Sequence, residues 1–358
     1  MFDVVAIGAG MAGLICAQQL RLAGYSVAVV EKSRGAGGRV ATRRVHGTRA
    51  DHGARYLEPQ GDAVQGLIEV LVDRHILKLW TDRVGEFRQG EMFSIPSSCY
   101  VAPAGMNAVG KYLAEDLDIW YGRRVKAISR TDSQMWHLSL EVTDDNLEIP
   151  QELIAKAVVV AIPAPQALMF LNSEMGFSPD FLDKLRSVEY DPCIAVMAGY
   201  SAERKSDLSN LNPQWQAVSF PDDADLAWVG LDSSKRLDLQ QPVFVVHSSA
   251  NFADRHLESV DLPTVGQELL DRTSEYLIPW LKQPEWLQVH RWRYAFCRNP
   301  LPVSCLPAGG NLPLVCAGDL CGEGQIEGAL RSGLAAANWV NSQLQNLPLY
   351  QLSKVLQQ

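Results

Sequence analysis

The chain lacks the cysteine pattern of a disulfide-stabilised or zinc-binding protein. Its seven cysteines are an odd number, and no two of them form a Cys-x-x-Cys pair. A disulfide framework would need an even set, and structural zinc would need closely spaced pairs of ligands. We therefore expect reduced thiols, as in a cytoplasmic protein, and no metal site.

The chain also has little that would attach it to a membrane or to nucleic acid. No apolar run approaches the roughly 20 residues needed to span a bilayer. Acidic residues outnumber basic ones by 41 to 32, and the net charge of −9 argues against an anionic partner. Because the first predicted strand begins directly after Met1, no cleavable signal or transit peptide is expected. The composition is that of an ordinary globular enzyme.

What the sequence does contain is a well-ordered N-terminal unit. It reads as a strand (3–7), a glycine-rich turn (8–13), a helix (14–23) and a second strand (26–30). A second glycine-rich turn follows over residues 34–39. A glycine fingerprint alone would be weak evidence, but the flanking strands and helix are correctly spaced. The unit therefore predicts a dinucleotide-binding site.

The turn residues have separate roles in such a site. Gly8 allows the tight turn, Gly10 lets a pyrophosphate approach the backbone, and Gly13 lets the helix pack closely on the strand. The helix that follows directs its free N–H groups and positive dipole end toward the phosphates. Glu31 ends the second strand, where its carboxylate can accept hydrogen bonds from both ribose hydroxyls.

A second strong pattern lies near the other end of the chain. The apolar residues 314–317 predict a buried strand that ends in Gly318-Asp319, and residues 326–344 predict a long helix. Asp319 can accept hydrogen bonds from ribityl hydroxyls. The start of the helix can stabilise negative charge at the pyrimidine edge of a reduced flavin. Together with the N-terminal unit, this pattern favours FAD over NAD.

The predicted fold class is α/β, with a Rossmann-type FAD-binding domain and an inserted α+β substrate domain. Helical spacing over residues 63–79 and 108–117 and an apolar strand over 157–162 belong to the first domain. The FAD-binding domain is predicted to comprise residues 1–75, 100–170 and 287–345, the substrate domain residues 76–99 and 171–286, and the C-terminal tail residues 346–358. Pockets tend to form where two such domains meet.

Further segments carry a resemblance to a known superfamily. They are the Gly-Gly-Arg39 turn, the segment Ala50-Asp51-His52-Gly53-Ala54-Arg55, the pair Gly105-Met106 and the pair Arg124-Val125. With the glycine turns, they resemble the FAD-binding amine-oxidase-like (p-hydroxybenzoate-hydroxylase-like) superfamily. Within it the chain is most similar to the renalase-like flavoproteins, through the segments around Cys193, Trp228, His247 and Trp292.

The resemblance implies FAD as the cofactor. We expect it to be held noncovalently, because no cysteine lies in an obvious flavin-attachment motif. His52 stands where relatives usually carry an apolar residue. The cofactor contacts implied by the resemblance are Gly8, Gly10, Met11, Ala12, Gly13, Glu31, Lys32, Gly38, Arg39, His52, Gly53, Ala54, Val125, Gly318, Asp319, Gln325 and Ile326.

The activity implied by the renalase-like resemblance is oxidation of 2- or 6-dihydronicotinamide dinucleotides to NAD(P)+. Hydride passes to flavin N5, and O2 accepts the electrons and gives H2O2. Loss of hydride makes the ring an aromatic cation, so no general base is needed. One alternative is a flavin amine oxidase acting on a small amine, although Gln325 and Ile326 stand where an aromatic residue is usual. The other is a non-catalytic FAD-binding or assembly protein. The oligomeric state is left open.

Four residues are candidates for positioning the substrate. His247 ends an apolar strand, where a structural histidine is the alternative interpretation. Trp292 and Tyr294 alternate with Arg293, so the two rings share one face of a strand. Core packing is their alternative role, and Arg293 on the opposite face can pair with a carboxylate instead of a substrate phosphate. Cys193 is a further residue whose distance from the pocket matters.

Overall fold

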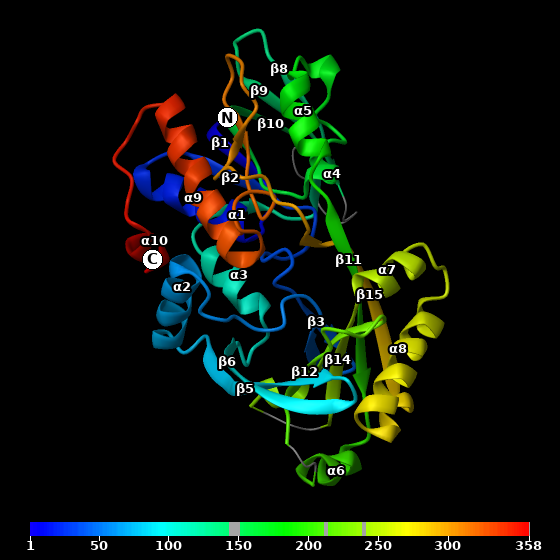
Figure 1. Ribbon diagram of the computed structural model, residues 1–358. Helices are drawn as coiled ribbons and strands as arrows, with labels where there is room; N and C mark the ends of the chain where they lie inside the picture. Colours follow the sequence, from blue (N-terminus) through cyan, green and yellow to red (C-terminus); the bar gives the residue numbers. More distant parts are fainter. Residues whose placement is uncertain (143–150, 211–213, 238–240, 358) are drawn as a thin grey trace.

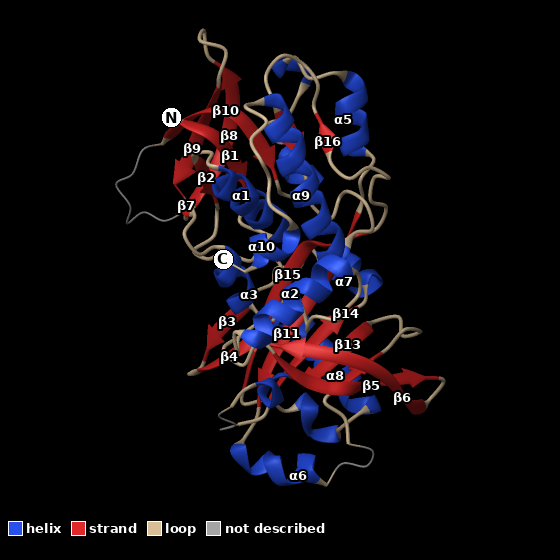
Figure 2. Ribbon diagram, turned by 90° about the vertical axis from the view of Figure 1, so that its left-hand side faces the viewer, coloured by secondary structure: helices blue, strands red, loops and turns tan. Residues whose placement is uncertain are grey.

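The computed structural model describes residues 1–142, 151–210, 214–237 and 241–357 (Figure 1). Two sheets dominate it, one in the upper and one in the lower half of the view in Figure 1. Figure 2 shows the same two halves from the side, with the N-terminus in the upper one. None of the helices in the described ranges is long and apolar enough to cross a membrane.

The upper sheet has eight strands, and parallel strands form its centre. The order along its main path is β16-β17-β10-β1-β2-β7, and the hairpin β8–β9 joins antiparallel to β10. Its strands are β1 (Phe2–Ile7), β2 (Val27–Val30), β7 (Asp118–Trp120), β8 (Arg123–Arg130), β9 (Trp136–Val142), β10 (Glu152–Val160), β16 (Leu306–Pro307) and β17 (Leu314–Cys316). Because both faces are covered, β2 is buried along its whole length.

The lower sheet has seven strands and is largely antiparallel. Its order is β15-β11-β14-β13-β12-β5-β6. Its strands are β5 (Lys78–Arg88), β6 (Glu91–Val101), β11 (Tyr190–Gly199), β12 (Ala217–Ser219), β13 (Leu226–Leu231), β14 (Val243–Ser248) and β15 (Trp286–Cys297). A separate two-stranded ribbon, β3 (Thr42–Val45) and β4 (Thr48–Asp51), leads from the two glycine turns toward this sheet.

The helices cover both sheets. Helices α1 (Met11–Ala23) and α9 (Gln325–Gln343) pack against each other, and a Cβ at Gly333 would lie 2.4 Å from the Ala12 carbonyl oxygen. On the lower sheet, α8 packs against β15 (Figure 1). The other helices are α2 (Asp62–Asp73), α3 (Asn107–Leu113), α4 (Ala164–Ala167), α5 (Pro179–Arg186), α6 (Lys205–Ser209), α7 (Ala250–His256), α8 (Leu262–Tyr276) and α10 (Leu352–Leu356), with short 3₁₀ turns between them.

The core divides according to the alternation of side chains along the strands. In β1, Val4 and Ala6 face the core that contains α1 and α9, whereas Val5 and Ile7 face the core that contains α5. A third core lies under α8 and contains Ile194. All of these side chains are at most 3% exposed, so both faces of the upper sheet are dry.

The structure confirms the predicted α/β fold class but shifts several elements. The helix expected over 63–79 ends at Asp73, because His75 adopts a left-handed φ of 57° that breaks the helical path. The chain then enters β5. The ribbon β3–β4, the hairpin β5–β6 and strand β11 have no counterpart among the predicted elements.

The sheet to which each strand belongs also decides how the chain divides into domains. The whole of β15 belongs to the lower sheet, whereas residues 287–297 were expected in the FAD-binding domain. Residues 171–188, expected in the substrate domain, contribute Phe181 and Leu185 to the core beneath the upper sheet. We therefore propose a substrate domain formed by residues 76–101 and 190–297, with the remaining described segments in the FAD-binding domain.

A buried carboxylate of α9 stabilises the start of α2. Glu327 accepts hydrogen bonds from the backbone N–H groups of Ala63, at 3.3 Å, and Val64, at 2.8 Å, and is 8% exposed. We expect Glu327→Ala to lower the free energy of unfolding by about 1–3 kcal/mol, because these donors would lose a charged acceptor. Urea denaturation of the FAD-saturated protein measures this change.

Glu69→Ala, on the exposed side of α2, is the matched control, with an expected change within about 0.5 kcal/mol. Equal losses in the two variants would contradict a capping role for Glu327.

Candidate functional site

The first glycine turn is shaped by backbone contacts that leave one open space. Gly8 has a left-handed φ of 103°, and a Cβ at Gly13 would lie 2.0 Å from the Gly8 carbonyl oxygen. A Cβ at Gly10, in contrast, would meet nothing within 4 Å. Helix α1 begins at Met11 and Ala12, which are buried, and no side chain caps its first turn. Free N–H groups thus face an open space at Gly10, as binding of a pyrophosphate requires.

Glu31 is held at the edge of this space. Its carboxylate accepts hydrogen bonds from the N–H groups of Ala9, at 2.8 Å, and Ser33, at 2.7 Å. A carboxylate can accept about four hydrogen bonds, so capacity remains for ribose hydroxyls. Val125 is buried in β8, two residues after Arg123, whose N–H donates to the Glu31 carbonyl oxygen. Lys32 is exposed, and its Nζ lies 3.5 Å from Gln166 Oε1.

The second glycine turn joins the two ends of the chain. Arg39 forms a two-pronged ion pair with Asp319, with Nη1–Oδ2 at 2.6 Å and Nη2–Oδ1 at 2.7 Å, across 280 residues of sequence. Burial opposes the charge, but the Asp319 carboxylate raises the pKa of Arg39 above its usual value. Arg39 Nη1 also donates to the Ala295 carbonyl oxygen in β15, at 3.1 Å. The Gly37 N–H donates to the Ala9 carbonyl oxygen, so the two glycine turns are in contact.

The segment after β4 packs directly on the second turn. The Ala54 N–H donates to the Arg39 carbonyl oxygen at 2.9 Å, and a Cβ at Gly53 would lie 1.9 Å from that same oxygen. Only glycine fits at position 53. A Cβ at Gly38 would lie 3.2 Å from the Gly10 Cα. The predicted cofactor residues 38–39 and 52–54 therefore form one surface beside the first turn.

The closing segment begins with unusual backbone geometry. Gly318 has a φ of 137° and donates its N–H to Ser332 Oγ at 3.1 Å. Gln325 also has a positive φ, 53°, at the first position of α9, and Ile326 follows it. Asp319 is 4% exposed beside these residues. The open space at Gly10, the uncapped α1 and the carboxylates of Glu31 and Asp319 fit the parts of FAD predicted to lie there.

A network of four buried charges supports the segment after β4. Lys235 Nζ pairs with Asp232 Oδ1 at 2.8 Å and with Asp51 Oδ2 at 3.4 Å, while Arg236 pairs with Asp51 at 2.9 Å and with Asp232 at 2.8 Å. Burial opposes ionisation, but Lys235 and Arg236 hold the pKa of Asp51 below its usual value. Lys235 Nζ also donates to the Arg55 carbonyl oxygen at 2.8 Å. The network is electrically balanced and fixes the backbone on both sides of His52.

A cluster of rings lies against the cofactor surface. The rings of His52 and Trp292 stack with centres 5.4 Å apart, and His290 lies edge-on to His52 at 4.7 Å. Trp292 Nε1 donates to the His52 carbonyl oxygen at 2.7 Å. Burial lowers the pKa of His52 to about 3 and that of His290 to about 4, so both rings are neutral at pH 7.

His247 joins this cluster from β14. Its Nδ1 accepts a hydrogen bond from Arg55 Nε at 3.2 Å, and burial holds its pKa well below the usual value. Its Nε2 is buried without a partner among the described residues, as is His52 Nδ1. Cys193 pairs in register with Trp292 and is also buried. Burial raises its pKa to about 11, so the thiol is protonated at pH 7.

The structure does not bring all four predicted substrate residues together. Trp292 lies in the ring cluster, and Tyr294 points to the same side of β15, where it packs edge-on against Tyr190 at 5.7 Å. Arg293 faces outward and pairs with Glu258 at 2.5 Å, so it does not reach the cluster. Its position follows from strand alternation, which puts successive side chains on opposite faces.

Several residues of the site were not predicted. They are Arg55, Trp228, Lys235, Arg236, Asp51, Asp232 and His290. Arg55 and Asp51 lie in the segment that carried the superfamily resemblance, directly beside predicted cofactor contacts. Their position beside predicted cofactor contacts is the feature of the sequence from which their place in the site could be predicted. In the described part of the chain, no three or more His, Cys, Asp or Glu residues are grouped to hold a metal.

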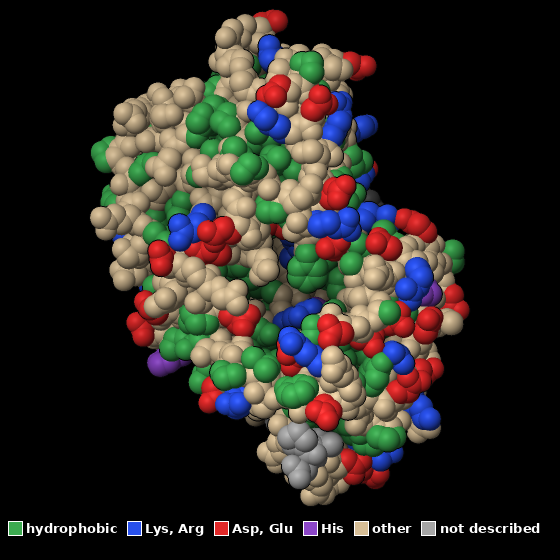
Figure 3. Space-filling model, in the orientation of Figure 1, with side chains coloured by type: hydrophobic (Ala, Val, Ile, Leu, Met, Phe, Trp, Pro, Cys, Tyr) green, Lys and Arg blue, Asp and Glu red, His purple; other side chains and the backbone are tan. Residues whose placement is uncertain are grey.

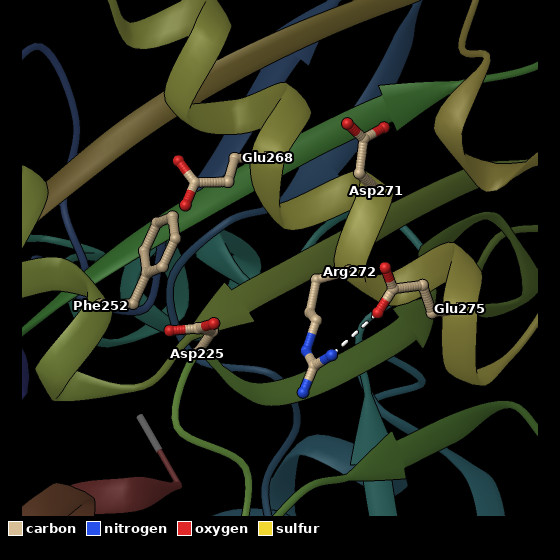
Figure 4. A pocket seen from close by; sticks show the side chains of 6 residues that line it. All are labelled: Asp225, Phe252, Glu268, Asp271, Arg272 and Glu275. Atoms are coloured by element: carbon tan, nitrogen blue, oxygen red, sulfur yellow. Dashed lines mark hydrogen bonds and ion pairs between the residues drawn. The ribbon is translucent and has the colours of Figure 1, made fainter.

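The surface is hollowed between the upper and lower halves, where basic and hydrophobic side chains are visible in Figure 3. A smaller hollow of about 260 Å³ lies at the outer side of α8, lined by Phe252, Arg272 and four acidic residues (Figure 4). A groove of about 670 Å³ follows β5, β6 and α6. Neither of the latter two contains a member of the ring cluster, so we place the site between the halves.

A parallel sheet with glycine turns joined to a largely antiparallel second sheet is the fold that the sequence predicts for an FAD-binding oxidoreductase. The pattern of the NAD(P)-binding Rossmann-like domain matches residues 7–71, and that of flavin-containing amine oxidoreductases matches residues 74–341. The chain therefore belongs to the flavin-containing amine oxidoreductase family. This family implies FAD as cofactor.

Individual relatives match shorter stretches. A protein named as a flavin-containing monoamine oxidase in Mycobacterium tuberculosis is 46% identical over 65 residues, which cover 18% of this chain and 14% of the relative. Putrescine oxidase of Kocuria rosea is 33% identical over 103 residues, which cover 29% of this chain and 19% of that protein. The matched parts thus span less than a fifth of the relatives' lengths.

Solved structures share the fold over nearly the whole chain. Wild-type putrescine oxidase bound to putrescine superimposes with a TM-score of 0.70 at 15% identity, covering 95% of this chain and 99% of that one. Cyclohexylamine oxidase from Brevibacterium oxydans gives a TM-score of 0.69 at 14% identity, covering 96% and 99%. At these identities the likeness shows the fold alone.

The open space at Gly10 makes a sharp test of cofactor binding. We expect Gly10→Ala to fold normally, because the new methyl group meets no protein atom, but to weaken FAD binding at least about tenfold by filling the space before the phosphates. Flavin fluorescence titration of protein stripped of FAD measures the affinity.

Gly13→Ala is the contrasting variant. Its methyl group would lie 2.0 Å from the Gly8 carbonyl oxygen, so we expect a loss of about 1–3 kcal/mol in stability even without FAD. Unchanged FAD affinity in Gly10→Ala would exclude this turn as the pyrophosphate site.

The buried His52 makes stability depend on pH. Its pKa is about 3 in the fold and about 6.5 in the unfolded chain, so the unfolded state binds more protons below pH 6.5 and acid destabilises the fold. Between pH 7 and pH 5 we expect His52 to account for a loss of about 2 kcal/mol. Urea denaturation at both pH values should show a loss about 2 kcal/mol smaller in His52→Leu than in the wild type, because His290 and His247 still contribute to the loss in the variant.

His52→Asn is the control, because it has no titrating group and a different shape. It should show the same shallower pH dependence as His52→Leu. If the free energy of unfolding depended on pH as steeply in both variants as in the wild type, a neutral, buried His52 would be ruled out.

Proposed function

We propose that this protein is an FAD-dependent oxidase that removes hydride from a carbon atom bonded to nitrogen. The observation that carries the proposal is the contact between the predicted cofactor surface and the ring cluster: Trp292 donates to the His52 backbone, and Arg39 bonds to β15. A planar nitrogen compound can thus be held against the cofactor. Bound FAD supplies the acceptor for the hydride and passes the electrons to O2, giving H2O2.

The residues of the chain bind and orient rather than exchange protons. His52, His290 and His247 are neutral at pH 7, and the two carboxylates nearby are already paired with Lys235 and Arg236. The nitrogen lone pair of the substrate stabilises the cation formed when hydride leaves, so a general base is not required at that step. The walls of the cluster keep water away and fix the ring.

Two substrate classes share this chemistry. Oxidation of a small amine is supported by family membership and by the fold shared with putrescine and cyclohexylamine oxidases. Oxidation of 2- or 6-dihydronicotinamides, our prediction from the renalase-like resemblance, is supported by Gln325 and Ile326 in place of an aromatic residue and by the stacked pair His52–Trp292. Of the two, the comparisons favour the amine class. The nonenzymatic alternative, a protein that only holds FAD, is an outcome of the same test.

Anaerobic mixing of the purified holoprotein with candidate substrates tests the proposal. We expect bleaching of the flavin absorbance within seconds by one class, primary amines or dihydronicotinamides, and stoichiometric H2O2 when air is admitted. Acid precipitation should release the flavin into solution, since we propose noncovalent binding.

Trp292→Ala is expected to slow bleaching at least about tenfold, because the ring platform is lost. Arg293→Ala lies on the outer face of the same strand and should leave the rate within about twofold. Failure of every amine and dihydronicotinamide to bleach the flavin would refute the oxidase and leave the FAD-holding role.

A further inference from the structure

Arg55 is a cation beside the ring cluster that has no counter-ion. It directly follows Ala54, and its guanidinium lies 5.3 Å from the centre of the Trp228 ring. Its Nε donates to His247 Nδ1 at 3.2 Å. Among the residues that the structure describes, no carboxylate pairs with Arg55, and no hydrogen bond engages its two terminal nitrogens. These nitrogens are not among the fully buried polar atoms that lack a partner, and Arg55 is partly exposed, so a ligand in solution can reach its guanidinium.

The groups around Arg55 provide no compensating charge. Burial raises the pKa of Tyr56 and of Cys193 and lowers that of His247, so all three side chains are neutral at pH 7. Burial also lowers the pKa of Arg55 itself, although an arginine remains charged throughout the physiological range.

The nearest carboxylates have other partners. Asp51 and Asp232 are balanced by Lys235 and Arg236. Glu58 acts to raise the pKa of Arg55 but forms no ion pair with it, and its Oε1 accepts a hydrogen bond from Ser97 at 2.5 Å. Among the described residues, Arg55 therefore has no ion-pair partner on the side of the ring cluster, although Glu58 and Arg43 are further charges near the site.

Burying a cation without a partner costs free energy, and the cost is offset when a ligand supplies the opposite charge. Guanidinium groups suit carboxylates and phosphates, because two N–H groups can bond to two oxygens at once. We propose that Arg55 binds an anionic group, a carboxylate or a phosphate, of the substrate. This inference rests on the proposed function and narrows its substrate to anion-bearing nitrogen compounds. Simple cationic diamines are disfavoured, since Arg55 repels them.

Matched substrate pairs test the role of Arg55 in the FAD-bound protein. One pair is phenylalanine and phenethylamine, which differ by a carboxylate; the other is a 6-dihydronicotinamide mononucleotide and its riboside, which differ by a phosphate. Anaerobic flavin bleaching gives the Kd of each. We expect the wild type to bind the anionic member of at least one pair at least about tenfold more tightly than the other member. The pair that shows this difference tells whether Arg55 binds a carboxylate or a phosphate.

Arg55→Met should abolish this preference by weakening the anionic member alone, and Arg55→Lys should restore part of it. Arg204→Met is the matched control, because Arg204 also lies 5.3 Å from an indole ring, that of Trp280, but is paired with Asp207 at the surface. FAD content and thermal stability report whether each variant folds. The inference would be overturned if Arg55→Met still bound the anionic member more tightly. It would also be overturned if the variant bound both members equally more weakly and its flavin potential shifted.

A binding measurement separates this inference from the proposed function. Nicotinate carries a carboxylate and has no hydride to give, so its binding can be followed through protein and flavin spectra without turnover. We expect Arg55→Met to weaken nicotinate binding at least about tenfold. Arg55-dependent binding in a protein that no substrate reduces would sink the oxidase and keep the anion site. If substrates reduce the flavin but Arg55→Met binds anionic and neutral members as the wild type does, the oxidase stands and the anion site is refuted.

Discussion

The ion pair between Arg39 and Asp319 is the contact on which the site depends. It joins glycine turns that lie 280 residues apart, and the same guanidinium reaches the backbone of β15 in the lower sheet. A two-pronged pair is directional, so it fixes orientation as well as distance, and the Asp319 side chain is only 6% exposed. The Arg39 carbonyl oxygen adds a second constraint, because Ala54 donates to it and Gly53 must be glycine beside it. One residue thus positions the cofactor surface, the segment after β4 and the strand that carries the ring cluster.

Burial explains the electrostatics on either side of that contact. Removing a group from water favours its neutral form, which is why the histidines of the cluster are uncharged and the Cys193 thiol stays protonated. Charges that remain are paired, as in the network of Lys235 and its partners. Arg55 differs from that network, because no carboxylate among the described residues forms an ion pair with it.

The sequence predicted the parts of the site that depend on local backbone geometry. Gly8 and Gly13 were predicted from their spacing and Gly53 from the superfamily resemblance, and at each of the three a nearby carbonyl oxygen excludes a side chain. The contact between Arg55 and His247 spans 192 residues and depends on the pairing of β14 with distant strands, which no local pattern encodes. The same limit applies to β15, whose place in the lower sheet is set by its long pairing with β11. The apolar spacing around Ile76 continued past the real end of α2 because one residue in a left-handed conformation leaves hydrophobicity unchanged.

The same difference between local and distant constraints separates the cofactor site, which the sequence predicts closely, from the substrate site, which it does not. Backbone contacts at Gly8, Gly13 and Gly53 leave no room for a side chain, so the shape of the cradle is closely constrained. The ring cluster and Arg55 are set by side chains from the segment after β4 and from β14 and β15, where a substitution alters shape or charge without breaking the sheet. Substrate choice can therefore change while the cradle stays fixed. Partial burial of Arg55 without an ion-pair partner costs free energy, and the anionic group that we propose for the substrate would offset this cost.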